Sequence, residues 1–260
     1  MEKLVSVIMP TYNRKWLLPR AIESVLTESY RNLEIILVND GGEDVQEVVD
    51  HFNDPRIKYF QNEKNKGLAA TRNVGLKNCS GDYICLLDDD DIHLQYTLEF
   101  RMYMVDKLQA DIVYTRSLLD FWEKMDNGYV SKGKVLYWDS PFDRDLILTQ
   151  NIAPCNCPLF SRKSWEKTNY WFDENMKTTE DHDFWAALSR NFFFHELKVV
   201  DVECTQRSDK SQMTGNLNFA KDWAITYKRW RHTAIDLDRV TRSQNNALMR
   251  AGLNPADYGL

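Results

Sequence analysis

The sequence predicts an α/β fold in which a mostly parallel central sheet is flanked by helices. Short apolar runs, rich in β-branched residues, alternate with stretches in which apolar residues recur at helical spacing. These runs are uniformly apolar, as is typical of strands buried on both faces, and right-handed crossovers join such strands in parallel. The predicted strands are 4–9, 33–38, 57–60 and 83–87, and the predicted helices between them are 17–26, 45–52 and 68–76.

The second half of the sequence is less regular. It predicts helices at 94–108 and 184–190, strands at 111–114, 192–194 and 198–202, and a loop followed by a strand at 151–161. Residues 121–139 show no clear period apart from a hairpin-turn signal at 126–128. From residue 218 the chain is predicted to be helical to its end, with Trp223, Tyr227 and Trp230 among basic residues. A helix packed on the domain is favoured there, and peripheral membrane contact is the alternative.

Composition places the chain among ordinary globular proteins. Its 260 residues are 43% hydrophobic and 28% charged, and the net charge of −6 argues against a nucleic-acid partner. The five cysteines are an odd number, and no leader precedes the first predicted strand, which favours reduced thiols. We therefore expect a cytoplasmic protein, with a place at the inner face of the membrane as an option.

Four consecutive carboxylates, Asp88 to Asp91, follow the predicted strand 83–87. One interpretation is a solvated acidic loop that caps the next helix, and the other is a site for a divalent cation. Polar residues also follow the other predicted strands, at 11–14, 39–40 and 62. Open α/β sheets bind ligands at the carboxyl ends of their strands, so the pattern predicts a nucleotide-sized ligand at this edge. No G-x-G-x-x-G motif follows the first strand, so an ordinary dinucleotide fold is not indicated.

Six short motifs stand at 7–14, 38–41, 65–67, 70–75, 81–91 and 179–185. They occur in the order seen in family 2 glycosyltransferases, which this sequence resembles. The likeness is close over residues 4–115 and returns at the acidic segment 179–185. It implies the GT-A fold, with a nucleotide-sugar-binding half at 1–115, an acceptor-binding and catalytic half at 116–215, and a helical extension at 216–260.

The resemblance also implies residue roles at the nucleotide end. Asp90 would bind Mn²⁺ or Mg²⁺ directly with Asp88 as its partner, while Asp89 would reach the ribose and Asp91 would serve the next helix. Within the nucleotide site, Thr11 and Tyr12 would line the uracil and ribose pocket, Asp40 would accept a hydrogen bond from the base, and Arg72 would face the nucleotide. The nucleotide-binding residues so implied are Pro10, Thr11, Tyr12, Asn13, Arg14, Asp40, Lys66, Arg72, Asp88 and Asp89.

For catalysis, the resemblance assigns Asp181 as the base, with Glu180 as the alternate. Helix N-capping is the other role open to Asp181. One base without a protein nucleophile predicts single displacement with inversion. Many relatives carry a histidine after this motif; residues 205–210 contain none, and Arg207 or Lys210 could neutralise the diphosphate instead. We expect His182 to be exposed at the start of a helix.

Together the motifs imply an inverting, metal-dependent hexosyl- or N-acetylhexosaminyltransferase. The donor would be a UDP-sugar and the acceptor a saccharide or a lipid-linked molecule, in cell-surface polysaccharide or glycoconjugate synthesis. Two alternatives stay open: a sugar-1-phosphate nucleotidyltransferase and a non-catalytic nucleotide-sugar-binding module. The motifs specify no oligomeric state.

Overall fold

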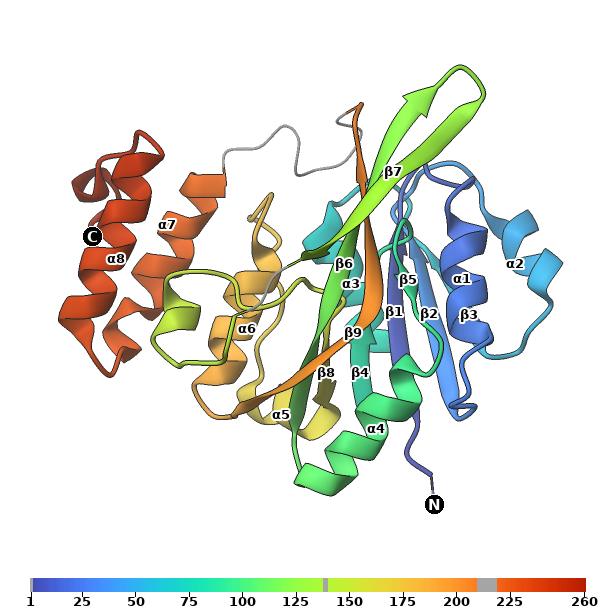
Figure 1. The fold of residues 1–260 in the computed structure, drawn as a ribbon, viewed down its shortest axis with the longest axis horizontal. Coiled ribbons are helices and arrows are strands. Elements are labelled where there is room, and N and C mark those ends of the chain that lie inside the picture. Colours follow the sequence, from blue (N-terminus) through green and yellow to red (C-terminus); the bar gives the residue numbers. More distant parts are fainter. Residues whose placement is uncertain (1, 138–139, 210–218) are drawn as a thin grey trace.

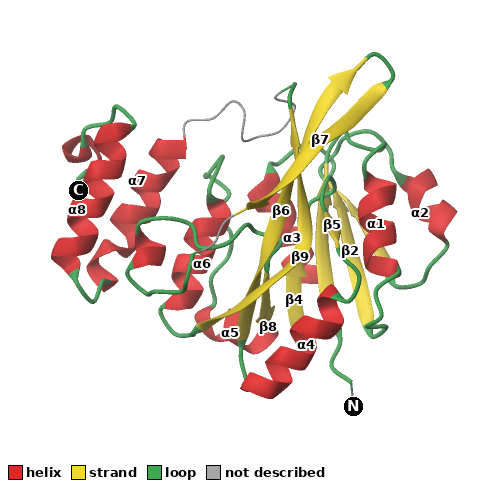
Figure 2. Ribbon diagram, viewed as in Figure 1, coloured by secondary structure: helices red, strands yellow, loops and turns green. Residues whose placement is uncertain are grey.

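The computed structural model describes residues 2–137, 140–209 and 219–260 (Figures 1 and 2). Its strands are β1 Val5–Thr11, β2 Leu33–Asn39, β3 Ile57–Gln61, β4 Tyr83–Leu86, β5 Ile92–His93, β6 Ile112–Met125, β7 Gly128–Tyr137, β8 Pro158–Ser161 and β9 Phe194–Arg207. Its helices are α1 Leu18–Leu26, α2 Gln46–Phe52, α3 Leu68–Asn78, α4 Thr97–Leu108, α5 Arg162–Thr168, α6 Glu180–Ser189, α7 Phe219–Trp230 and α8 Leu237–Arg250.

One mostly parallel sheet organises the molecule, as predicted. The strand order is β3-β2-β1-β4-β8-β6-β9-β5, and β7 pairs with β6 outside this order. Strands β1 to β4 are parallel, and so are β6 and β9, whereas β8 runs antiparallel to both of its neighbours. Strand β8 therefore joins two parallel halves.

Separate hydrophobic cores cover the two faces of the sheet. Alternate residues of β1 illustrate the division: Ile8 packs in one cluster with α3 and α6, whereas Val7 packs in the other with α1 and α4. All seven residues of β1 and all seven of β2 are buried. The uniformly apolar sequence of these strands follows from burial on both sides.

Strand β1 continues through Pro10, which the sequence analysis placed in the following loop. Pro10 pairs in register with Val38 of β2. The nitrogen of Leu87 donates to the carbonyl of Ile8, so the backbone polar groups of Ile8 face β4. Backbone groups of every second residue face the same side of a strand, so those of Pro10 also face β4. Because the pairing of β1 with β4 ends at Ile8, the N–H that proline lacks would have had no strand partner.

Residues 121–137 form regular strands, which the sequence analysis missed. Strand β6 runs on to Met125, the predicted turn follows, and β7 returns along it; this hairpin projects beyond the body in Figure 1. Nearly every residue of β7 is exposed, so no buried face imposes an alternating pattern. The two late strands are likewise one strand, β9. Glu196 interrupts its apolar pattern but pairs with Arg116 of β6 at 2.9 Å.

Two helix predictions also need correction. The helix expected at 94–108 begins at Thr97, because Ile92 and His93 pair with β9 as the short strand β5. Helix α5, which was not predicted, follows β8 directly, and the side chain of Ser161 caps it by accepting from the nitrogen of Ser164. A helix of seven residues carries too few apolar positions to establish a period.

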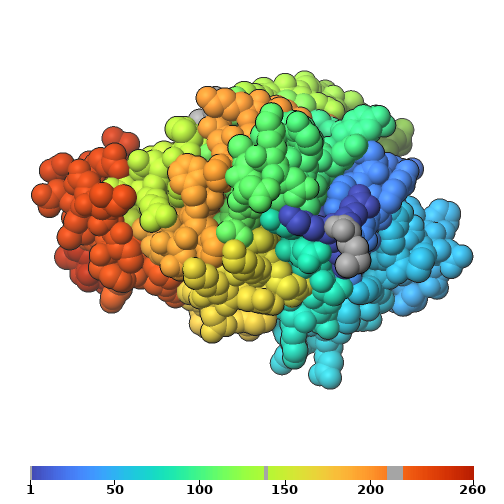
Figure 3. Space-filling view, turned by 90° about the horizontal axis from the view of Figure 1, so that it is seen from below, coloured from blue at the N-terminus to red at the C-terminus, as the bar shows by residue number. Residues whose placement is uncertain are grey.

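The C-terminal helices α7 and α8 lie at one end of the molecule, opposite the N-terminal half (Figure 3). They pack on the domain, as the favoured interpretation predicted. Tyr227 is buried, and the Trp230 indole donates to Asp183 of α6 at 2.9 Å. Among the described residues, no helix combines the length and apolar character needed to cross a membrane.

Candidate active site

The predicted nucleotide site lies where β1, β2 and β4 end at the same edge of the sheet. The hydroxyl of Thr11, the last residue of β1, donates to Asp89 Oδ2 at 2.7 Å. Both side chains are buried, at 3% and 2% exposure. The acidic run after β4 is therefore not a solvated loop.

Arginines neutralise this acidic run. Arg14 Nη1 lies 3.0 Å from Asp89 Oδ1 and 3.1 Å from Asp90 Oδ2. Arg207 Nη1, from the end of β9, lies 2.9 Å from the same Asp90 oxygen. Arg207 is thus beside the acidic run, whereas Lys210 lies outside the described residues.

Asp91 does not serve the next helix. Its Oδ1 accepts the backbone nitrogen of Thr205 at 2.8 Å, and its Oδ2 accepts the amide of Asn156. Helix α4 begins six residues later, after the short strand β5, so the carboxylate of Asp91 ties β4 to β9 instead. Asn156 is 1% exposed, so it belongs to a buried loop.

Burial and neighbouring charges shift the pKa values of Asp88, Asp89 and Asp91 in different directions. Burial raises the pKa of Asp89 to about 7 despite the opposing Arg14, and the neighbouring Asp90 adds to the rise. Burial and the charge of Asp90 raise the pKa of Asp91 well above its ordinary value. Burial also disfavours ionisation of Asp88, but the Arg72 guanidinium outweighs it and lowers the pKa. Asp88 is therefore the carboxylate that Arg72 holds ionised.

Asp40 organises the loop before α3. Its Oδ1 accepts the nitrogen of Lys66 and the amide of Asn62, both at 2.9 Å, and its Oδ2 accepts the nitrogen of Gly67 at 2.9 Å. Gly67 has φ +95°, and a Cβ there would meet nothing within 4 Å, so open space adjoins this loop. The structure brings Asp40 and Lys66 together through the backbone, while the Lys66 side chain is exposed.

The loop after β1 divides its residues between the surface and the site. Tyr12 is 44% exposed. Asn13, which has φ 53°, accepts the nitrogen of Glu43 at 2.8 Å through its side chain. Arg14 alone of these three contacts the acidic run.

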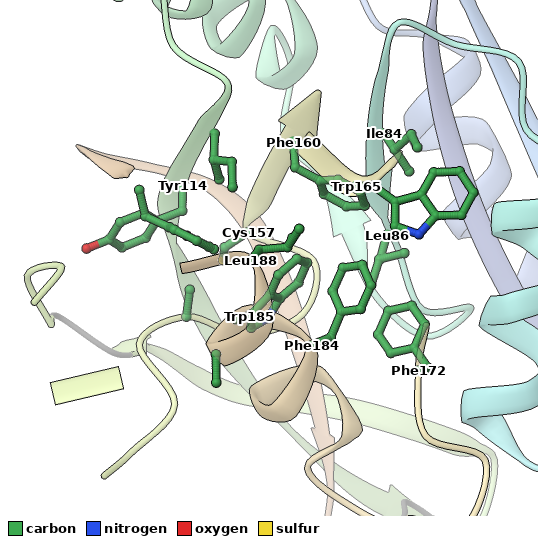
Figure 4. Packing of buried hydrophobic residues seen from close by; sticks show 14 of the residues in the cluster. Ile84, Leu86, Tyr114, Cys157, Phe160, Trp165, Phe172, Phe184, Trp185 and Leu188 are labelled. Carbon is green, nitrogen blue, oxygen red and sulfur yellow. The ribbon is translucent and has the colours of Figure 1, made fainter. Parts of the chain in front are cut away.

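Helix α6 brings the second acidic motif to the site because its aromatic residues are fixed in the core. Phe184 and Trp185 are fully buried (Figure 4). Both contact Phe160 of β8, and Phe184 also stacks on Phe172. Nine of the ten residues of α6 are buried. Asp181 is the one residue of this helix that keeps substantial contact with solvent.

Arg72 joins the two acidic motifs. Arg72 is 1% exposed. Its guanidinium donates to Asp88 Oδ1 at 2.8 Å through Nη2 and pairs with Glu180 through Nη1. Cys155, which lies between the motifs, donates to Asp88 Oδ2 at 3.4 Å. Burial and the charge of Asp88 raise the pKa of the Cys155 thiol well above its ordinary value, with a further contribution from Asp181. The Cys155 thiol therefore contacts Asp88 and is close enough to Asp181 to be affected by its charge.

Glu180 and Asp181 are in different environments. Burial raises the pKa of Glu180 to about 7; the Arg72 guanidinium opposes this rise and the Asp181 charge adds to it. Asp181 accepts the side chain of Asn151 at 2.9 Å through Oδ2 and the nitrogen of His182 at 2.8 Å through Oδ1. The residue before α6, Thr179, is its N-cap, so capping is not the role of Asp181.

His182 is buried, and our expectation of an exposed side chain was wrong. Its Nε2 lies 2.6 Å from the carbonyl of Ile147, and burial lowers its pKa. Packing on nearly every side of α6 leaves no solvent face at this position. Asn151 was not predicted as a site residue, because it stands in no motif and reaches Asp181 only through the fold. The sequence left Cys155 equally open as a residue of the acceptor cleft and of a buried structural loop, and the structure places its thiol against Asp88.

Residues 6–191, more than half of the chain, match the family model described as glycosyl transferase family 2. The chain belongs to glycosyltransferase family 2. The family-2 resemblance found in the motifs is confirmed. So is the GT-A fold, because TarS of S. aureus (residues 1–349, in complex with UDP-GlcNAc) superposes with a TM-score of 0.71, covering 95% of this chain and 72% of TarS at 18% identity.

Curated relatives of this family-2 chain are named glycosyltransferases. A protein of Escherichia coli (strain K12), provisionally named as a colanic acid biosynthesis glycosyl transferase, is 33% identical over 196 residues, which cover 71% of this chain and 66% of that protein. An uncharacterized glycosyltransferase of Rickettsia bellii (strain RML369-C) is 43% identical over 215 residues, which cover 76% of this chain and 29% of the Rickettsia protein. The family-2 chain thus spans less than two thirds of either relative.

Proposed function

We propose that the chain is an inverting, cation-dependent glycosyltransferase that moves a sugar from a UDP-sugar to an acceptor hydroxyl in cell-surface polysaccharide or glycoconjugate synthesis. The observation that carries this proposal is the bridge formed by Arg72. It joins Asp88 of the predicted donor site to Glu180, the neighbour of the partly exposed Asp181. The diphosphate of the donor and the base that deprotonates the acceptor hydroxyl can therefore meet at one place.

The proposed donor is supported by the loops at the strand ends and by one solved structure. The exposed ring of Tyr12 and the Asp40-held loop flank the edge of the sheet to which a nucleotide would bind. TarS, which shares the fold, was solved with UDP-GlcNAc. The name of the Escherichia coli relative supports a polysaccharide role.

The residues present fit a divalent cation shared with a diphosphate. Asp88 and Asp90 offer hard oxygen ligands, and in the described part of the chain no three acidic, histidine or cysteine side chains are grouped as a complete metal site. Mg²⁺ is often held by one or two carboxylates together with substrate phosphates. The cation, when bound, would stabilise the charge that develops on the leaving diphosphate.

Asp181 is the proposed base. A base must reach the acceptor hydroxyl, and Asp181 keeps solvent contact, whereas Glu180 is 4% exposed and is paired with Arg72. Asn151 holds one carboxylate oxygen of Asp181 in place. With a single base accepting the proton, the acceptor oxygen attacks the anomeric carbon directly and the configuration inverts.

A donor screen tests the proposal. Nucleotide sugars are assayed with Mn²⁺ for thermal stabilisation and donor hydrolysis, and stabilisation by the true donor should follow mass action. With that donor, Asp181→Asn should retain binding but lose about 10²–10⁴-fold in kcat. Asp90→Ala should lose the cation-dependent part of UDP binding, measured by calorimetry.

The matched control is Asp238→Asn, which makes the same change at an exposed position of α8. It should leave both binding and turnover unchanged. Full turnover by Asp181→Asn would place the base elsewhere, and equal UDP affinity of Asp90→Ala and wild type would refute the cation site.

A further inference from the structure

Two guanidinium groups from distant segments converge on one carboxylate oxygen. Arg14 and Arg207 both contact Asp90 Oδ2, at 3.1 Å and 2.9 Å. Arg14 follows β1 and Arg207 ends β9. Asp90 is 7% exposed and the Arg207 side chain 2%, so water screens these contacts poorly.

This arrangement conflicts with cation binding at the same oxygen. A divalent cation and two guanidinium groups within hydrogen-bonding distance of one oxygen repel one another strongly where solvent is excluded. One carboxylate oxygen also has only two lone pairs, and both arginines already donate to it. A cation at Asp90 Oδ2 must therefore displace at least one arginine.

A displaced arginine would bind the diphosphate of the nucleotide. Guanidinium groups bind phosphate oxygens through paired, charge-assisted hydrogen bonds. Arg14 also donates to Asp89 Oδ1 at 3.0 Å, and Arg207 is the last residue of β9, so both guanidinium groups lie at the strand ends to which the diphosphate would bind. The same charge that opposes the cation thus favours the anion.

We propose that Arg14 and Arg207 hold Asp90 while no nucleotide is bound and turn to the diphosphate when cation and donor arrive together. This inference rests on the proposed function, because it takes a nucleoside diphosphate and a divalent cation as the ligands. Each ligand alone must compete with an internal ion pair. When both ligands are present, the cation binds Asp90 and the phosphates bind the two arginines. Binding of the cation and of the nucleotide is therefore strongly cooperative, and each raises the affinity for the other by the same factor.

The test compares Arg207→Gln with wild type in two separate titrations: Mn²⁺ without nucleotide and UDP without metal. The variant should bind Mn²⁺ about tenfold more tightly, because Asp90 loses a competing cation, and UDP about tenfold more weakly. These opposite signs are not expected from general loss of structure. Arg207→Lys, which keeps the charge, should leave the Mn²⁺ affinity near the wild-type value.

Arg20→Gln is the matched control. It removes one guanidinium that pairs with Glu203 of β9 at 2.6 Å and changes the net charge equally, without a contact to the acidic run. It should change neither affinity. Arg14→Gln, in a different segment, should also bind Mn²⁺ more tightly and UDP more weakly than wild type. It replaces Arg207→Gln in the test if that variant does not fold.

Unchanged or weaker Mn²⁺ binding in both glutamine variants would overturn the exchange. The proposed function fails by a different result, namely that wild-type protein with Mn²⁺ binds no nucleotide sugar or UDP. The Mn²⁺ titration without nucleotide still decides the competition at Asp90 in that case.

Discussion

Replacing Arg72 by methionine should destabilise the protein in a pH-dependent manner. The substitution keeps an unbranched chain in α3 but removes the guanidinium shared by Asp88 and Glu180. Breaking a buried ion pair by deleting one partner costs about 3–5 kcal/mol. Because the Asp88 side chain is 26% exposed and that of Glu180 only 5%, most of this cost should come from Glu180.

The pH dependence follows from Glu180. Burial raises its folded-state pKa from 4.5 to about 7, and the Arg72 charge opposes that rise. For an acid with a raised folded-state pKa, stability is retained below the unfolded value and lost as pH rises toward the folded value. Without Arg72 the folded-state pKa of Glu180 lies higher still, so the variant loses more of its free energy of unfolding at alkaline pH. We expect a destabilisation of about 2 kcal/mol near pH 5 and about 4 kcal/mol near pH 8.

Urea unfolding followed by circular dichroism at both pH values measures these differences. The control is Lys132→Met, which breaks an exposed pair with Glu123 on the hairpin, where the side chains are 51% and 49% exposed. It should cost less than about 1 kcal/mol at both pH values. If Arg72→Met cost the same at both pH values, Glu180 would not be the carboxylate that bears the loss.

Three further outcomes are expected. A Cβ at Gly75 would lie 2.2 Å from Ile8 Cγ2, so Gly75→Ala should lower the free energy of unfolding by about 1–3 kcal/mol although alanine favours helix; stabilisation would contradict this packing. Asn151→Ala removes the hydrogen bond that orients Asp181 and should lower kcat by about tenfold with donor affinity near the wild-type value; an unchanged kcat would mean that Asn151 does not position the proposed base. Burial and the charge of Asp88 raise the pKa of the Cys155 thiol, so iodoacetamide should alkylate it at least about tenfold more slowly than free cysteine; an equal rate would show an accessible thiolate.

Burial explains which strands could be predicted from the sequence. Strands β1 and β2 are buried along their whole length, and their apolar runs identify them directly. Strand β7 is held by its pairing with β6 and by contacts such as the stacking of Tyr129 on Trp16, whose ring centroids are 5.2 Å apart. Backbone pairing leaves no hydrophobic signature, so this strand was missed.

The site was predictable in part for a similar reason. The position of Asp88 to Asp91 follows from the end of a buried strand, which a local pattern reveals. Their partners do not follow, because Arg207 meets Asp90 across 117 positions of sequence and Arg72 meets Glu180 across 108. The strand order decides which arginine neutralises which carboxylate. The sequence of neither segment alone predicts that β9 lies beside β6.

Helix α7 supports α6, the helix that carries the proposed base, although the family match ends at residue 191. Asp183 of α6 is fully buried, and its carboxylate accepts the Trp230 indole at 2.9 Å and pairs with Arg229. A buried carboxylate without these donors would be costly, so its position depends on α7. Asp181 lies two residues earlier on the same helix. The orientation of the proposed base therefore depends on a segment outside the part of the chain that identifies the family.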